Sequence, residues 1–193
     1  MVQFPPENVI TGNPPVDLAR READLSLRFR KPEQPSMVAR RLGQAAWAVY
    51  GSAAYVERAG VPRAGRQLEG HEVIAFSDDL AGTVGARWLR ENGQRARAVM
   101  RSDSLLSHAA AVAAGLGLSP LPCLCGDAHP DLRRLFPRTV GHHDIWLVVH
   151  PDVRTSARVR AVMDCVTQLV QKEAPLLGGR TPRTSKHARP ATR

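Results

Sequence analysis

The sequence predicts an α/β fold, because apolar runs of strand length alternate with stretches of helical periodicity along most of the chain. The segment 97–122 shows this unit clearly. A short apolar run ends at a polar corner, Ser104 can cap an alanine-rich helix, and glycines at 115 and 117 can stop it before a second apolar run. That helix carries no acidic or basic residue, as is typical of crossover helices covered by a parallel sheet, so mostly parallel pairing is expected.

A second observation concerns two aromatic and aliphatic strands, AAWAVYG at 45–51 and DIWLVVH at 144–150. They bracket a long segment that contains strand and helix patterns of its own. A lobe inserted into another lobe, entered along one strand and left along the other, explains this order.

The first half of the chain is expected to start with a short helix over 16–22, where prolines are tolerated in the first turn. Leu25, Leu27 and Phe29 alternate with polar neighbours, which indicates a strand over 23–29. Further strands are expected over 37–42 and 45–51, followed by a helix over 52–60 and a strand over 72–76.

In the second half, Val84, Trp88 and Leu89 stand at helical spacing, which predicts a helix over 80–91 that ends near Gly93. The segment after 122 is expected to be irregular, with a helical turn near its start. Valines and other apolar residues recur on one face of 155–172, so this stretch is the clearest amphipathic helix.

Composition is that of a globular chain, with 43% hydrophobic residues over 193 positions, which suits one domain or two small lobes. No apolar run approaches the roughly 20 residues that a bilayer-spanning helix needs, and MVQFPPENV lacks the regions of a secretion signal, so a cytoplasmic protein without membrane contact is expected. Three cysteines cannot all pair, and no disulfide framework is expected.

The formal net charge of +9 is typical of chains that bind nucleic acid. Five of the basic residues, however, lie in the acid-free stretch from 178 to the end. Because this stretch has almost no large apolar side chain to bury, we expect 175–193 to be a disordered basic tail. Contact of the tail with polyanions would be non-specific.

Cys123, Cys125 and His129, with His142 and His143 nearby, raise the possibility of a metal site. The two cysteines leave a single residue between them, whereas zinc knuckles usually leave about two to four, so no metal is predicted. A cysteine–histidine catalytic pair lacks an orienting partner, and no nucleotide-binding or nucleophile motif is present. The sequence therefore predicts a protein that is not an enzyme and carries no cofactor.

The order of several motifs resembles a known family. TGNPPVDLARREADLSLRF, VARRLG, WAVYGSAAYVERAG, SLLSHAAAVAAGLGLSPLP and DIWLVVHPDVRTSARVRAVMDCV together resemble the effector-binding domain of LysR-type transcriptional regulators, over about 8–169. The resemblance implies a type-2 periplasmic-binding-protein-like α/β fold, in which two α/β lobes are joined by two crossover strands and a small molecule binds between them. Its implied boundaries are 1–43 and 147–174 for lobe I and 44–146 for lobe II.

This sequence departs from the family at its start. The family's winged helix-turn-helix, its linker helix and the first strand and helix of the effector domain have no counterpart before residue 8. Lobe I is therefore expected to be incomplete, with an exposed sheet edge and an uncovered apolar face.

The resemblance also implies an effector site built from chain corners that face the cleft. Its expected members are Gly12, Asn13, Arg28, Phe29, Phe76, Ser77, Ser102, Asp103 and Ser104. The Arg28 guanidinium and the helix N-terminus at Ser104 suit a carboxylate, although Asp103 would repel one. Alternatives remain open at this point: Asn13 as an ordinary helix cap, Arg28 as part of a solvated basic run, and Phe76 as plain core.

The expected function is small-molecule sensing by a regulator of transcription, in a homo-oligomer that meets DNA only through a helix-turn-helix absent from this chain. Two alternatives share the two-lobed fold. A solute-binding protein of transport would need a secretion signal or an anchor, and an enzyme such as a deaminase would need a catalytic set that the sequence does not show.

Overall fold

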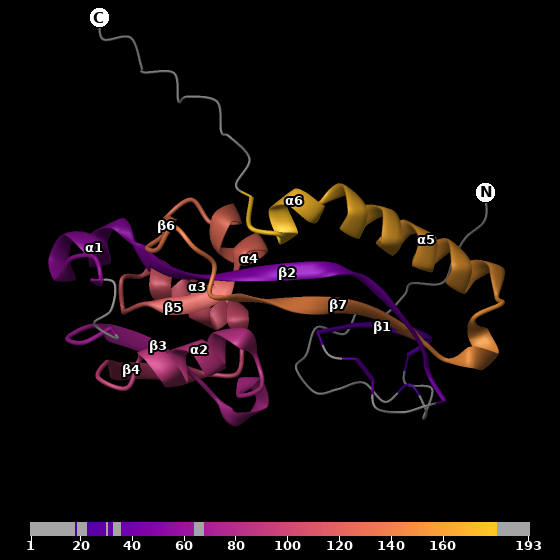
Figure 1. Cartoon of the computed structure of the whole chain (residues 1–193), viewed down its shortest axis with the longest axis horizontal. Helices are drawn as coiled ribbons and strands as arrows, with labels where there is room; N and C mark the ends of the chain where they lie inside the picture. The colour runs from indigo at the N-terminus through magenta and orange to yellow at the C-terminus, as the bar shows by residue number, and fades with distance from the viewer. Residues whose placement is uncertain (1–17, 19–22, 30, 33–35, 64–67, 181–193) are drawn as a thin grey trace, which may run out of the picture.

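A computed structural model describes residue 18 and residues 23–29, 31–32, 36–63 and 68–180 of the chain (Figure 1). In chain order its elements are β1 (Leu25–Arg28), β2 (Val38–Ser52), α1 (Ala53–Ala59), β3 (Glu72–Phe76), the 3-10 turn η2 (Asp78–Leu80), α2 (Val84–Asn92), β4 (Arg97–Ser102), α3 (Leu105–Ala113), β5 (Ser119–Pro122), α4 (Cys123–Ala128), β6 (Leu132–Arg134), β7 (Gly141–Val149), the 3-10 turn η3 (Pro151–Val153), α5 (Ala157–Lys172) and α6 (Ala174–Leu177).

The long strand β2 is the axis of the fold. Its first part pairs antiparallel with β7, from Val38 opposite Val149 to Trp47 opposite Gly141. Its last part pairs with β5 along the other edge and with β6 beyond the end of β7. We call the elements from α1 to β6 the inserted lobe, and β1 with α5 the outer lobe. Figure 1 shows these two groups at opposite ends of β2 and β7.

The core of the inserted lobe forms where strands and helices meet around β2. β3 and β4 pair in parallel, and the amide of Ile74 donates to the carbonyl of Leu118 at 2.9 Å, which joins this pair to the chain entering β5. Tyr50, Ile74 and Val112 are fully buried between β2, β3 and α3. The uncharged helix α3 is therefore covered on its apolar side, as its composition predicted.

Several local predictions are confirmed. β3 occupies the expected residues, and Ser52 caps α1 by accepting from the amide of Tyr55 at 3.2 Å. Ser104 caps α3 through the amide of Ser107, and Gly93 follows the end of α2. The expected helix over 16–22 lies outside the described residues apart from Leu18, which is buried against Val148.

The expectation of mostly parallel pairing is wrong for the described strands. β1, β2, β5, β6 and β7 all pair antiparallel, and parallel pairing occurs only between β3 and β4 and at the bridge of Val73 with Leu118. The chain enters the inserted lobe along β2 and returns along β7. These two strands therefore run in opposite directions and pair directly with each other.

The two strands expected over 37–42 and 45–51 are one continuous strand. The ladder between β2 and β7 absorbs an extra residue at a bulge between Arg41 and Gly43. Asp144 of β7 accepts hydrogen bonds from Arg41 at 2.9 Å and Gln44 at 3.1 Å, on either side of the bulge. The glycine that looked like a strand end thus marks an irregularity within the strand.

The outer lobe presents apolar side chains at its sheet surface. Leu27 is 52% exposed and Phe29 is 48% exposed, and among the described strands β1 pairs with β7 alone. On the other side, α5 and α6 run along β2 and β7 (Figure 1), where Val170 and Leu177 pack with Ala45.

The predicted disordered tail is wrong for residues 175–180. Leu177 of α6 is buried, and the Gly179 carbonyl accepts a hydrogen bond from Arg134 at 2.7 Å. The amide of Arg180 donates to Pro175 at 2.8 Å. Leu177 buries against Ala45 of the sheet, which outweighs the basic composition that follows. Residues 181–193 lie outside the described part of the chain.

The anchor of this C-terminal segment is a polar cluster. Arg134 forms an ion pair with Asp127, whose carboxylate also accepts from the Tyr50 hydroxyl at 2.7 Å. Burial, followed by the hydrogen bond to Asp127, raises the pKa of Tyr50. Gly126 makes room for the cluster, because any Cβ there would overlap the Tyr50 ring. One guanidinium thus connects β6, α4, β2 and the chain after α6.

Replacing Arg134 by methionine should destabilise the fold by roughly 2–4 kcal/mol, because it leaves a mostly buried carboxylate and a carbonyl without their donor. Chemical denaturation measures the free energy of unfolding. Arg133→Met is the control, since Arg133 is the exposed neighbour on β6, and it should cost less than about 0.5 kcal/mol. Equal effects of the two substitutions would show that the cluster contributes nothing to stability.

Candidate functional site

A series of five rings runs from the outer lobe to the inserted lobe. The Phe29 ring lies 5.7 Å from His143, which lies 5.7 Å from Trp47. Trp47 lies 6.4 Å from Phe76, and Phe76 stacks on His108 at 4.4 Å. The rings come from the end of β1, from β7, β2 and β3, and from α3. Segments far apart in the sequence therefore meet at the junction of the two lobes.

The middle of the ring series is tied to helix α2. The amide of Val84 donates to Nε2 of His143 at 2.7 Å, so this nitrogen carries no proton. Thr83 caps the same helix by accepting from Ala86 at 3.2 Å. Gly85 lets the helix approach Trp47, because a Cβ there would lie 2.6 Å from Cε3 of the indole. The first turn of α2 thus fixes two rings of the series.

The inserted-lobe end of the series lies where β3 and β4 finish. Phe76 is opposite Ser102 in the parallel pair, and the amide of Ser77 donates to the Ser102 carbonyl at 3.0 Å. The Ser102 hydroxyl accepts from the amide of Ser104 at 3.1 Å. Arg101 donates to the Phe76 carbonyl at 2.7 Å. Four of the predicted site residues are therefore held together by strand pairing and by hydrogen bonds from backbone amides.

His108 is fully buried beneath this corner. Its Nε2 lies 3.2 Å from the Ser102 carbonyl and must donate to it, so Nδ1, 2.8 Å from the Ser119 hydroxyl, accepts. Burial lowers the pKa of His108, and the neutral ring suits both contacts. His108 is thus a buried histidine whose two ring nitrogens are both hydrogen-bonded.

Two buried polar atoms close to the ring series have no hydrogen-bond partner within the described part of the chain. They are Nε1 of Trp47 and the hydroxyl oxygen of Ser77. Each such atom costs about 1–3 kcal/mol of desolvation that no protein contact repays. Unpartnered buried groups are rare in folded proteins and mark places where a water or ligand completes the structure.

The other predicted site residues have different placements. Nε of Arg28 donates to the Ser26 hydroxyl at 3.0 Å, on the side of β1 opposite the Phe29 ring, so these two neighbours do not point the same way. Asp103 is exposed. Gly12 and Asn13 lie outside the described residues.

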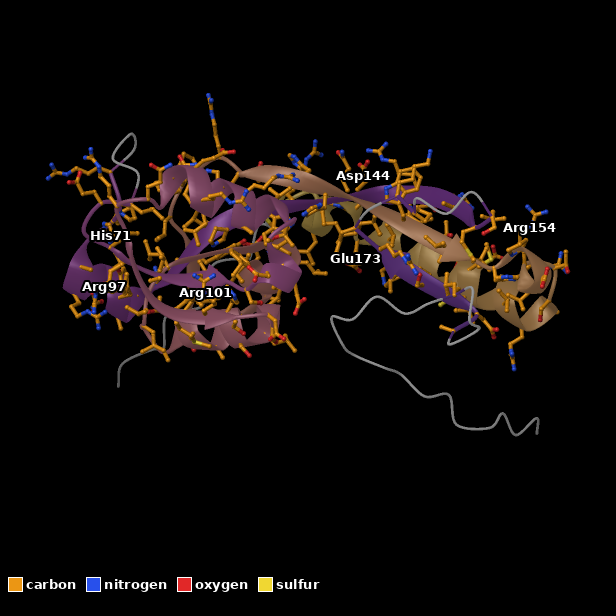
Figure 2. The ribbon with its side chains drawn as sticks, turned by 90° about the horizontal axis from the view of Figure 1, so that it is seen from below. His71, Arg97, Arg101, Asp144, Arg154 and Glu173 are labelled. Carbon is orange, nitrogen blue, oxygen red and sulfur yellow. The ribbon has the colours of Figure 1, made fainter. Side chains whose placement is uncertain are left out.

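Sequence reasoning missed Trp47, His143 and Arg101. Trp47 was interpreted only as part of a buried strand, and His143 was considered only for a metal site, which was then rejected. Figure 2 shows Arg101 in the same lobe as His71 and Arg97, at the end of the molecule away from Arg154.

The cysteine and histidine cluster does not assemble. In the described ranges, no group of three or more His, Cys, Asp or Glu side chains could hold a metal ion. Burial raises the pKa of the thiols of Cys123 and Cys125, which keeps both protonated at neutral pH and poor as nucleophiles. No helix in the described residues is long and apolar enough to span a membrane.

Comparison with solved structures identifies the class of fold. The regulatory domain of CrgA, a LysR-type transcriptional regulator from Neisseria meningitidis, matches 78% of this chain and 77% of its own, with a TM-score of 0.63 and 21% identity. The effector domain of the transcriptional regulator AmpR of Pseudomonas aeruginosa matches 84% of this chain and 80% of its own, with a TM-score of 0.66 and 20% identity. The fold is thus the type-2 periplasmic-binding-protein-like α/β fold with two lobes and two crossover strands, as predicted.

The family follows from the sequence itself. Residues 8–171 match the model of the LysR substrate binding domain, and the chain belongs to this family. An HTH-type transcriptional regulator of Xanthomonas campestris pv. campestris (strain 8004) is 39% identical over 65 residues, which are 34% of this chain and 19% of that regulator. The chain thus matches less than a fifth of this relative's length. The family and these relatives are transcriptional regulators, not enzymes.

The free energy of unfolding should fall as the pH drops below 6.5, the ordinary pKa of histidine, in part because of His108. A histidine whose pKa is lowered in the folded state binds its proton more readily when unfolded, so acid favours unfolding. Denaturant titrations at about pH 7.5 and about pH 5.5 measure the loss, which His108→Gln should reduce. His129→Gln, at a partly exposed position, is the control and should keep the loss of the unmodified protein. An unchanged loss in His108→Gln would contradict the assignment.

Proposed function

We propose that this chain senses a small-molecule effector for a LysR-type regulator and thereby controls transcription. The observation that carries the proposal is the ring series, which joins strand ends of both lobes in a chain that belongs to an effector-domain family. In open α/β folds, ligands collect at such strand ends. A molecule bound there contacts both lobes and so can favour one of their relative arrangements.

The proposed lobes are 1–43 with 147–174 and 44–146, with the effector between them. The transport alternative is not favoured, because the matching family and the similar structures are regulators. Sequence-specific DNA contact would come from a helix-turn-helix outside this chain, in a cytoplasmic homo-oligomer. Side-by-side pairing would cover apolar side chains such as Leu27.

The proposed effector site keeps the nine residues expected from the sequence and adds the rings between them. Phe29, Phe76, Ser77, Ser102 and Ser104 receive support from the ring series and the hydrogen bonds at the end of β3. The proposed ligand is a small metabolite with a carboxylate. Arg101, bonded to the Phe76 carbonyl, brings a second guanidinium to the inserted-lobe side of the site.

Arg28→Ala should lower the affinity for the effector roughly ten- to a hundredfold, because a charge-assisted hydrogen bond contributes about 1.5–3 kcal/mol. This loss requires that the Arg28 guanidinium turns from Ser26 to the carboxylate of the ligand when the effector binds. Ser102→Ala should cost less, roughly two- to tenfold, because its hydroxyl is neutral. A thermal-shift screen of amino acids and of aromatic and aliphatic acids supplies the ligand, and calorimetric titration measures its affinity.

Arg160→Ala, at an exposed position on α5, is the control for the loss of charge and should leave the affinity unchanged. A ligand that binds equally well to the unmodified protein, Arg28→Ala and Ser102→Ala would place the site elsewhere. Failure of every compound in the screen to bind would contradict the proposed function.

Any DNA affinity of this chain should be weak, indifferent to sequence and steeply reduced by salt, because it would come from phosphate contacts. Truncation should begin at Thr181, since Gly179 and Arg180 are part of the fold. It removes four basic residues and no acidic one, and should abolish most of the binding. Gel shifts against competitor DNA measure both effects, and replacing the same four residues by glutamine is the control for length. Operator-specific binding by this chain would contradict the prediction.

A further inference from the structure

We propose that the indole N–H of Trp47 and the hydroxyl of Ser77 bind the effector, and that the effector carries a hydrogen-bond acceptor oxygen on a flat unsaturated body. The inference rests on the proposed function and specifies the chemistry of its ligand. It follows from the two buried polar atoms that lack a partner among the described residues.

Trp47 is placed as a rigid donor. Its side chain is 1% exposed, and the Cε3–Cζ3 edge of the indole faces the first turn of α2 at Gly85. Nε1 lies on the opposite edge of the same ring system, away from that helix. The neighbouring rings of His143 and Phe76 lie 5.7 and 6.4 Å from the indole, centre to centre. A phenylalanine at this position would pack against the same rings without burying an N–H group, so packing does not explain the indole nitrogen.

Ser77 differs from three other helix-capping residues in the described part of the chain, whereas Ser156 before α5 likewise makes no side-chain cap. Ser52, Thr83 and Ser104 have extended backbones before a helix, and each side chain accepts from an amide of the first turn. Ser77 stands at the same position before η2, with φ −76° and ψ 173°, yet its side chain makes no such hydrogen bond.

The position of Ser77 is nevertheless fixed. Its amide donates to the Ser102 carbonyl, which also accepts from His108. Ser77 directly follows Phe76, the neighbour of Trp47 in the ring series. The two unpartnered groups thus come from the residue after Phe76 and from the indole ring beside Phe76. The proposal is that one small molecule meets both.

The chemistry of the two groups defines the ligand. An indole N–H only donates, so the ligand atom that it meets must be an acceptor, and a serine hydroxyl can donate to the same oxygen. Phe76 and His143 offer ring faces and edges against which a flat unsaturated body packs. Both polar atoms are sealed from solvent, so a ligand reaches them only when the packing between the rings opens. Occupancy of the site is thereby coupled to the arrangement of the lobes.

The test on the unmodified protein uses the three indole N–H resonances of the ¹⁵N-labelled chain, assigned with Trp88→Phe and Trp146→Phe variants. Benzoate and benzamide are the probes that carry an acceptor oxygen. Benzylamine, which has the same ring but no acceptor when protonated, is the control. We expect benzoate or benzamide to move the Trp47 resonance downfield in a saturable way and to leave those of Trp88 and Trp146 in place.

Ser77→Ala gives the second measurement. Because the lost hydroxyl has no partner among the described residues, the variant should be as stable as the unmodified chain or more so, yet bind benzoate roughly three- to tenfold more weakly. Ser52→Ala is the control: Ser52 is a buried serine whose hydroxyl caps α1, so the substitution should lower stability and leave the affinity unchanged.

The inference is overturned if the probes bind without moving the Trp47 resonance, or if Ser77→Ala loses stability and keeps its affinity. It also fails if neither acceptor-bearing probe binds at millimolar concentration. None of these results decides the proposed function, which is tested by the wider screen of amino acids and of aromatic and aliphatic acids.

Discussion

The antiparallel ladder between β2 and β7 is the constraint on which the rest of the structure depends. Both strands run through the junction of the lobes, so each lobe builds on one end of the same pair: β1 on β7, and β5 and β6 on β2. At the bulge, Asp144 accepts from Gln44 and Arg41, and these hydrogen bonds lower the pKa of its carboxyl group. The bulge is thus pinned by side chains, and Figure 2 shows Asp144 midway along the molecule.

The polar cluster around Arg134 and the polar groups beside the ring series differ in whether their hydrogen bonds are complete. Around Arg134, every strong donor and acceptor has a partner, and the cluster includes the Tyr50 hydroxyl, the Asp127 carboxylate and the Gly179 carbonyl. Fully satisfied networks of this kind rigidify a core and specify one arrangement. Beside the ring series, by contrast, Trp47 and Ser77 leave buried groups unsatisfied. The region around β2 therefore contains one network whose hydrogen bonds are complete and one pair of polar groups that a further molecule can complete.

Local signals in the sequence were enough for many elements. The caps at Ser52 and Ser104 and the apolar run of β3 depend on neighbours in the chain, and these elements were predicted correctly. The direction of pairing was not, because it depends on how the chain returns along β7, far away in sequence. The site shows the same division. Strand ends such as Phe76 and Ser102 were predicted, whereas the ring series joins Phe29, His143 and Trp47, and no local pattern reports that these three meet.

The C-terminal segment adds a third connection between the lobes. Helix α5 lies along β2 and β7, and the chain that leaves it buries Leu177 beside Ala45 before Gly179 meets Arg134 of the inserted lobe. Since Arg134 is in turn fixed to Asp127, the end of this segment moves with the inserted lobe. Wide separation of the lobes would have to break that charge-assisted hydrogen bond or bend the chain between α5 and α6. A small rotation about the ladder, by contrast, preserves it. Such a rotation still changes the spacing of Phe29 from Phe76, because these two rings belong to different lobes, and a ligand held between them would therefore set the angle of the rotation.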